Sequence, residues 1–285
     1  MGRIRTIDDL DVAGRRVFVR VDFNVPIRDG VVTDDSRIRA ALPTIERLRA
    51  AGGRLVVASH LGRPKKRDPA ASMEPAAARL AELLDGEVRL ADDCIGDGPR
   101  KVAADLRDGD VAVLENLRFH KGEEANDAAF AAELRRLCDL YVNDAFGCAH
   151  RAHASVEALP RLVHDRAAGL LMTREFEALA RLLGRADRPF VAVVGGAKVS
   201  DKIGVLGNLL GRVDVFLIGG AMANTFLAAR GLPMGRSLVE ADAVRTAREF
   251  LFKVEAAGAA VLLPVDLVVA GSADAASGEA VAAGA

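Results

Sequence analysis

The sequence predicts an α/β protein with two parallel-sheet domains joined by a helix. Short β-branched runs alternate with longer segments of helical spacing over residues 17–142, and again over 190–269. This alternation is typical of parallel sheets whose strands are connected by helices. The length of 285 residues fits two domains, since domains commonly contain about 100–200 residues.

The first block predicts four strands and three helices. The strands are expected at 17–21, 55–59, 111–115 and 140–142, and the helices at about 38–48, 75–84 and 126–137. Pro43 lies inside the first helical pattern, so this helix is expected to be kinked or to begin later. Gly52 and Gly53 are expected to end it as a glycine C-cap. Asn126 is expected to cap the third helix.

The second block repeats the alternation after a helix expected near 172–184. Its strands are expected at 190–194, 215–218 and 260–269, and its helices from Ser200, from Ala221 and near 241–257. The residues after Ala270 are mostly small and show no periodicity, so no ordered element is predicted there.

Composition excludes several classes of function. A net charge of −1 gives no general attraction to nucleic acid or to an anionic membrane. No uninterrupted apolar run reaches the roughly 20 residues that span a bilayer. Cys94, Cys138 and Cys148 form no CxxC pair and are odd in number, which argues against a disulfide framework or a zinc site. We therefore expect a cytoplasmic protein with reduced thiols, in which local basic clusters bind any anion.

Polar and basic residues follow every predicted strand of the first block. They are Asp22, Asn24, His60, Arg63, Glu115, Asn116, Arg118, His120, Asp144, His150, Arg151 and His153, with Arg37 between the first strand and its helix. The carboxyl ends of parallel strands meet at one edge of a sheet. Because arginine binds carboxylate and phosphate in a bidentate manner, several arginines at this edge favour a small, multiply anionic ligand. The alternative is a set of ordinary turns and solvated surface arginines.

Two Gly-Gly pairs follow strands of the second block. Gly195 with Gly196, and Gly219 with Gly220, allow close approach of a ligand near a helix N-terminus, which binds anions. Neither pair belongs to a Walker A loop or to a G-x-G-x-x-G fingerprint.

Lysine is scarce in this chain, which has seven lysines and 32 arginines. Lys198 and Lys202 nevertheless follow the first Gly-Gly pair and would share a helical face if the helix begins early enough. An ammonium group is a mobile point charge that suits phosphate oxygens. The alternative for the two pairs and the lysines is tight turns and a solvated helix start.

Eight motifs in order resemble the phosphoglycerate kinase family. They are "RVDFNVP" (20–26), "TDDSRI" (33–38), "SHLGRP" (59–64), "ENLRFH" (115–120), "NDAFGCAHRAHAS" (143–155), "GGAKVSDKI" (195–203), "GGAMANTF" (219–226) and "LLPVD" (262–266). They cover nearly the whole chain. The resemblance implies reversible phosphoryl transfer between 1,3-bisphosphoglycerate with ADP and 3-phosphoglycerate with ATP, as in glycolysis.

The resemblance also implies the domain plan. Two Rossmann-like, three-layer α/β/α domains would be joined by a hinge helix and would close to exclude water. The boundaries are expected at 1–168 for the triose-binding domain, 169–187 for the linker and 188–285 for a partial nucleotide-binding domain. The expected partners are the two triose substrates and ATP or ADP with Mg²⁺, bound by a monomer.

The site residues implied by the resemblance fall into two groups. The substrate-binding group is Asp22, Phe23, Asn24, Arg37, His60, Leu61, Gly62, Arg63, Arg118 and Arg151. The nucleotide-binding group is Gly195, Lys198, Lys202, Gly219 and Gly220. Arg37, Lys198 and Lys202 are the implied catalytic residues, which would stabilise charge on the transferred phosphoryl group.

The chain departs from the family pattern near its end. A "WNGP"-like segment and a "GGGD" loop, which the resemblance leads us to expect, do not occur. That loop would supply the magnesium-binding Asp, so no metal ligand is predicted in this chain. We expect a phosphoglycerate kinase whose sequence is cut short. The alternative is a 3-phosphoglycerate-binding chain without catalysis. A Rossmann-type dehydrogenase is disfavoured because the dinucleotide fingerprint is missing.

Overall fold

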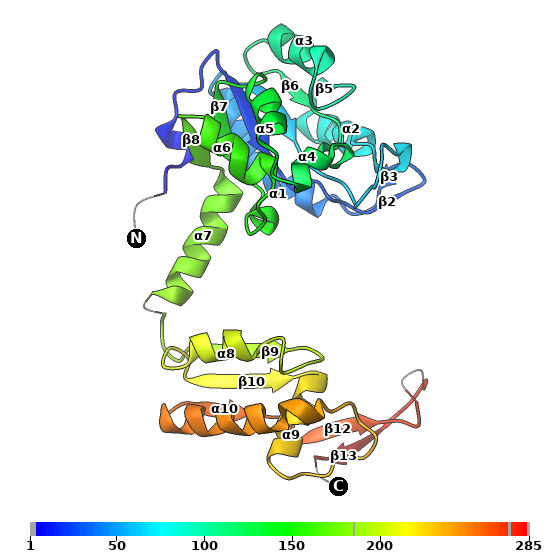
Figure 1. Cartoon of the computed structure of the whole chain (residues 1–285), viewed down its shortest axis with the longest axis vertical. Coiled ribbons are helices and arrows are strands. Elements are labelled where there is room, and N and C mark those ends of the chain that lie inside the picture. The colour runs from blue at the N-terminus through cyan, green and yellow to red at the C-terminus, as the bar shows by residue number, and fades with distance from the viewer. Residues whose placement is uncertain (1–3, 185, 273–274, 284–285) are drawn as a thin grey trace. The chain divides into compact units, whose positions relative to one another are not determined.

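The computed structural model describes residues 4–184, 186–272 and 275–283 (Figure 1). The chain divides into two compact units, Met1–Ala180 and Arg181–Ala285. The division falls inside helix α7 (Leu170–Leu183), which is the helix expected near 172–184. Within the described residues, no helix is both long and apolar enough to cross a membrane.

The first unit is built on a six-stranded parallel sheet. Its order is β5 (Val88–Leu90), β6 (Val111–Val113), β4 (Arg54–Ala58), β1 (Arg16–Arg20), β7 (Leu140–Asn143) and β8 (Arg166–Ala168). The four inner strands are those predicted from the sequence. A short antiparallel ribbon, β2 (Ile27–Arg28) with β3 (Val31–Val32), lies outside this sheet.

Helices cover both faces of this sheet, as the predicted three-layer arrangement requires (Figure 1). Val17 and Val19 pack on the side of α1 (Ser36–Ala50) and α2 (Glu74–Leu84). Phe18 and Tyr141 pack on the opposite side. The helices on that side are α3 (Asp97–Asp105), α4 (Lys121–Glu124), α5 (Ala128–Arg135) and α6 (Leu159–Leu162). Because successive strand side chains point to opposite faces, each strand contributes to two cores.

Two helix boundaries differ from the expectation, and one agrees with it. Helix α1 begins at Ser36 and continues through Pro43, because its buried face includes residues on both sides of the proline. Its end matches the prediction: Gly52 has φ +78°, and the Gly53 N–H donates to Leu48 O at 3.0 Å. Asp127, rather than Asn126, caps α5, and its carboxylate accepts from the Phe130 N–H at 2.7 Å.

The second unit contains a three-stranded parallel sheet in the order β11 (Ala260–Leu262), β10 (Val215–Gly219) and β9 (Val191–Gly195). Helices α8 (Ile203–Leu209), α9 (Ala221–Ala229) and α10 (Val244–Ala256) pack on one face, over a core that includes Phe216 and Ile218. On the other face, Val191, Val193 and Leu262 are 42%, 78% and 53% exposed.

The end of the second unit corrects two expectations. The run 260–269 forms two strands, because Pro264 lacks the N–H that a continuing strand needs. The second of these, β12 (Asp266–Val269), pairs antiparallel with β13 (Glu279–Ala282). A strand therefore lies in the stretch for which no ordered element was predicted.

Candidate functional site

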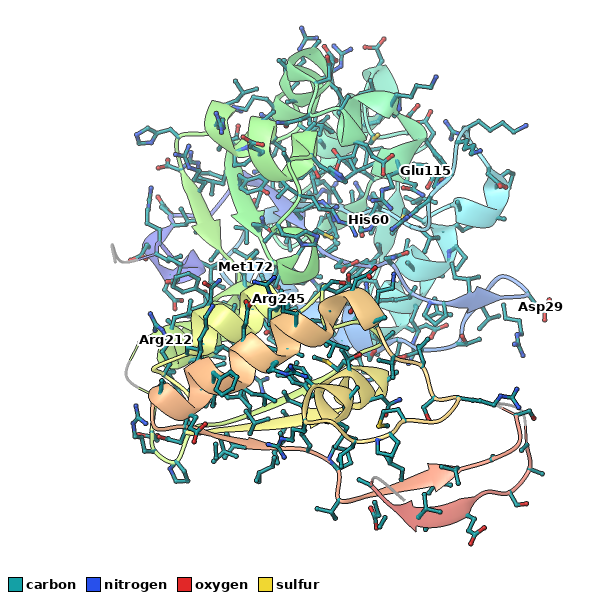
Figure 2. All side chains as sticks on the ribbon, turned by 60° about the horizontal axis from the view of Figure 1, so that its bottom comes forward. Asp29, His60, Glu115, Met172, Arg212 and Arg245 are labelled. Atoms are coloured by element: carbon teal, nitrogen blue, oxygen red, sulfur yellow. The ribbon has the colours of Figure 1, made fainter. Side chains whose placement is uncertain are left out.

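The carboxyl ends of the inner strands bring the predicted polar residues of the first unit to one edge. Strand β1 pairs with β4 through Arg20 and Ala58, and with β7 through Arg20 and Asn143. The residues that follow these strands therefore meet beyond Arg20. They include His60, which is labelled in Figure 2.

A buried arginine fixes the orientation of His60. Arg20, which is 1% exposed, has Nη2 3.2 Å from His60 Nδ1. A guanidinium only donates, so Nδ1 accepts and the ring proton resides on Nε2. Burial first, and then the charges of Arg20, Arg118 and Arg151, lower the pKa of His60 to about 2. The imidazole is therefore neutral and offers an Nε2–H donor to an anion.

Glu123 balances the charge of Arg20 from within the core. Its carboxylate is fully buried and accepts from the Ser155 hydroxyl at 2.6 Å and from the Ser155 N–H at 2.9 Å. The same hydroxyl accepts from Arg20 Nε at 2.8 Å, and Glu123 Oε1 lies 4.0 Å from Arg20 Nη2. The sequence reasoning missed both Glu123 and Ser155. No local pattern marks Glu123, although Ser155 closes one of the recognised motifs.

Two asparagines hold the loop that carries His60. Asn24 Oδ1 accepts from the Gly62 N–H at 2.8 Å. Asn116 Oδ1 accepts from the Leu61 N–H at 3.2 Å, and its Nδ2 donates to Leu61 O at 2.8 Å. Gly62 adopts φ +60°, which favours glycine. Phe23 and Leu61 are buried. The Phe23 N–H donates to Ser59 Oγ at 2.8 Å, so the backbone N–H groups of both residues are bonded within the protein.

Four arginines lie around this edge, and two of them have protein partners. Arg37 Nη1 pairs with Asp22 Oδ2 at 2.9 Å. Arg118 Nη1 donates to Gly62 O at 2.6 Å, and burial lowers the pKa of its guanidinium. The side chains of Arg63 and Arg151 make no hydrogen bond or ion pair with any residue in the described ranges. Their positive charge is therefore available to a ligand.

Three strand-end residues serve the fold instead of this edge. His120 Nε2 lies 2.6 Å from Asp93 Oδ1, and its ring stacks on Phe130. Glu115 accepts from the Met73 N–H at 2.7 Å and from the Ser72 hydroxyl at 2.8 Å, at the start of α2. Asp144 accepts from the Met172 N–H at 3.1 Å, in α7. His120, Glu115 and Asp144, which follow predicted strands, therefore make contacts within the protein.

The Gly-Gly pairs of the second unit lie against each other. Gly195 and Gly219 are register partners at the ends of β9 and β10. Gly220 has φ +67°, and a Cβ there would lie 2.9 Å from Gly196 O. The Met222 N–H donates to the same oxygen at 2.9 Å, at the start of α9. Only glycine permits this approach, which leaves the first turn of α9 beside a bare backbone.

The two lysines do not share a helical face, which corrects the expectation. Helix α8 begins at Ile203, so Lys202 is its N-cap and Lys198 lies in the preceding loop. The carbonyl of the buried Val199 accepts from the N–H groups of Lys202 and Ile203 at 3.0 and 2.9 Å, in the turn that precedes the helix. A Cβ at Gly196 would lie 3.9 Å from Lys202 Cε, so this side chain reaches back to the glycine pair.

Comparison with known proteins is decisive at this point. The family model described as phosphoglycerate kinase matches residues 7–285. The chain belongs to the phosphoglycerate kinase family. A phosphoglycerate kinase of Anaeromyxobacter sp. (strain K) is 58% identical over 269 residues, which cover 93% of this chain and 68% of that protein. The phosphoglycerate kinase of Chloroherpeton thalassium is 53% identical over 267 residues, which cover 93% of this chain and 67% of that protein.

Solved structures of phosphoglycerate kinases agree with this assignment. The Coxiella burnetii enzyme superposes with a TM-score of 0.87 at 36% identity, covering 98% of this chain and 71% of that chain. The Pyrococcus horikoshii OT3 enzyme superposes with a TM-score of 0.81 at 36% identity, and the match covers 93% of this chain and 68% of that chain. The α/β fold predicted from the sequence is therefore confirmed for this family member.

Acidification is expected to destabilise this protein through His60. The folded state keeps the imidazole neutral down to about pH 2, whereas the unfolded state takes up a proton below the ordinary pKa of 6.5. The unfolded state thus binds more protons, and stability falls as the pH falls below about 6.5. Between about pH 7 and about pH 5, the His60 contribution to this loss is about 2 kcal/mol.

Urea unfolding of the wild type and of His60→Gln at the two pH values measures this contribution. The variant lacks the titrating group, so its free energy of unfolding should fall by about 2 kcal/mol less than that of the wild type. His153, whose pKa burial also lowers, is present in both proteins and cancels. Equal losses would mean that His60 titrates normally in the folded state.

Proposed function

We propose that the first unit binds 3-phosphoglycerate and 1,3-bisphosphoglycerate at its strand-end edge. One observation carries the proposal: the His60 Nε2–H donor and Arg63 follow β4, and Arg151 follows β7, at the same edge of the sheet on the two sides of β1. Among the described residues, the side chains of Arg63 and Arg151 have no hydrogen-bond or ion-pair partner. A small ligand with a phosphate and a carboxylate matches this set of donors. The proposed substrate-binding residues are Asp22, Phe23, Asn24, Arg37, His60, Leu61, Gly62, Arg63, Arg118 and Arg151.

Each group has a separate role in this proposal. Arg63, Arg118 and Arg151 neutralise the anionic groups of the triose. Asp22 hydrogen-bonds a hydroxyl group of the ligand, and Asn24 holds the Gly62 backbone in place. Arg37, which is half exposed and paired with Asp22, stabilises charge on the phosphoryl group during transfer.

The second unit is proposed to bind ATP or ADP at the paired glycine loops. The close approach of Gly220 to Gly196 and the first turn of α9 form a backbone surface that fits phosphate. Gly195, Gly219, Lys198 and Lys202 complete the proposed site. Mg²⁺ would arrive with the nucleotide and neutralise phosphate charge; we assign no residue of this chain as its ligand.

The proposed reaction is reversible phosphoryl transfer between 1,3-bisphosphoglycerate with ADP and 3-phosphoglycerate with ATP. The acceptor is an ionised carboxylate or phosphate, so no general base is required. Catalysis then depends on positioning and charge stabilisation, and Arg37, Lys198 and Lys202 are the proposed catalytic residues. The second candidate function is 3-phosphoglycerate binding without transfer.

Calorimetric titration of the full chain with 3-phosphoglycerate tests the triose site. We expect saturable binding at low ionic strength that weakens as salt is added, because the exposed guanidinium groups are screened. A coupled assay of ATP formation from 1,3-bisphosphoglycerate and ADP then separates the two candidates. Transfer supports the kinase, and binding without transfer supports the second candidate. Titration heats that never saturate, even at low salt, would contradict both.

We also propose a cytoplasmic monomer. The cytoplasmic location is supported by Cys94, Cys138 and Cys148, which are buried free thiols. Burial raises the pKa of the Cys138 thiol to about 12, which keeps it protonated and unreactive. The native mass in solution tests the monomeric state.

A further inference from the structure

A single carboxylate holds the loop that carries the two lysines. The Ser200 N–H donates to Glu240 Oε2 at 3.1 Å, and the Ser200 hydroxyl donates to Glu240 Oε1. Ser200 lies between Lys198 and Lys202, so both lysines are within two residues of this contact. These hydrogen bonds lower the pKa of Glu240, with a smaller contribution from the charge of Lys198. The carboxylate is thus ionised and doubly engaged.

Helix α9 in turn fixes Glu240. The Glu240 N–H donates to the hydroxyl of Thr225, a fully buried residue of α9, at 3.0 Å. Asn224 Nδ2, from the same helix, donates to Leu238 O at 3.1 Å. Helix α9 begins beside the Gly196 loop. Glu240 therefore links the helix at the glycine loops to the segment that carries the lysines, across 40 residues of sequence.

We propose that Glu240 is a positioning residue, which fixes the Ser200 turn so that Lys198 and Lys202 meet the phosphates of a bound nucleotide. This inference rests on the nucleotide site proposed above. Glu240 acts through Ser200 and does not itself touch the nucleotide. A lysine side chain has many rotamers, and anchoring its backbone limits the positions that the ammonium group can reach.

Limited proteolysis with a lysine-specific protease tests the fixation directly. Glu240→Gln retains the size of the side chain but accepts only one of the two hydrogen bonds from Ser200. Cleavage after Lys198 and Lys202, followed by mass spectrometry, should become about tenfold faster, because the segment opens more often. Cleavage after Lys253, in α10, should not change. Ser200→Ala, which removes only the hydroxyl donor, should give a smaller increase.

ADP affinity distinguishes a positioning role of Glu240 from a purely structural one, because loss of a purely structural contact would leave the affinity unchanged. Glu240→Gln should weaken ADP binding several-fold while the unfolding transition of the second unit stays in place. The control is Glu249→Gln, an equal charge change at an exposed glutamate that pairs with Arg245. Wild-type cleavage rates or an unchanged ADP affinity in Glu240→Gln would overturn the role of Glu240 alone. A wild type that binds no ADP would instead overturn the proposed nucleotide site.

Discussion

Replacing Glu123 with alanine should lower the free energy of unfolding of the first unit by about 3–5 kcal/mol. Glu123 and Arg20 are 0% and 1% exposed, so the substitution leaves an uncompensated cation in the core. It also removes the acceptor of both the Ser155 N–H and the Ser155 hydroxyl. An unpaired buried charge and two orphaned donors are among the most costly changes a core can undergo.

Tyr141 makes this loss measurable for the first unit alone. The chain has one tyrosine and no tryptophan, and the Tyr141 hydroxyl donates to Ser155 O at 2.8 Å, within the network of Glu123. Tyrosine fluorescence during urea unfolding therefore reports on this unit. Glu87→Ala, at an exposed glutamate, is the control and should change stability by less than about 0.5 kcal/mol.

A loss below about 1 kcal/mol in Glu123→Ala would contradict a charged Arg20–Glu123 pair. If the alanine variant does not fold, Glu123→Gln provides the measurement. It retains an acceptor for Ser155 but removes the charge, so it should also be destabilised, by less than the alanine variant.

Arg151→Ala should weaken 3-phosphoglycerate binding about 10- to 100-fold without destabilising the protein. The Arg151 side chain makes no hydrogen bond or ion pair with any residue that the structure describes. Its removal therefore breaks no side-chain hydrogen bond or ion pair among the described residues. A charge-assisted hydrogen bond to phosphate or carboxylate, by contrast, contributes about 1.5–3 kcal/mol to binding.

Calorimetry at low salt measures the affinity, and tyrosine-monitored unfolding measures the stability. Arg161→Ala removes an equal charge from an exposed arginine that pairs with Glu157, and it should leave the affinity within about threefold of the wild type. Removal of Arg118 is less informative, because it also breaks the bond to Gly62 O. Unaltered affinity in Arg151→Ala would remove this residue from the proposed triose site.

The inner strands of the first unit could be predicted because they consist of apolar, mostly β-branched runs that are buried on both faces. The edge strands show no such run: β5 has Arg89 at its centre, and β8 has two alanines after Arg166. The same logic predicted which residues gather at one edge, since parallel strands place their ends together. It did not predict which of those residues bind protein groups instead of facing this edge. His120, for example, contacts Asp93, which lies 27 positions earlier in the sequence.

Long-range polar contacts account for the rest of what the sequence could not reveal. The Arg20–Ser155–Glu123 network joins positions up to 135 residues apart, and spacing carries no signal for such contacts. The lysine geometry depended on where α8 begins, and the helix begins at Ile203, after both lysines. Helical periodicity does not fix the exact residue at which a helix starts.

Val191, Val193 and Leu262 give the second unit a plane of hydrocarbon in contact with water. An apolar surface that packs against this plane displaces water, and the free energy of burial is favourable by about 25 cal/mol for each Å² of apolar surface removed from solvent. Among the described residues of the first unit, the six-stranded sheet has no such plane, because helices lie on both of its faces. Val193 is the most exposed of the three residues, so a polar residue at this position would remove the largest part of that plane.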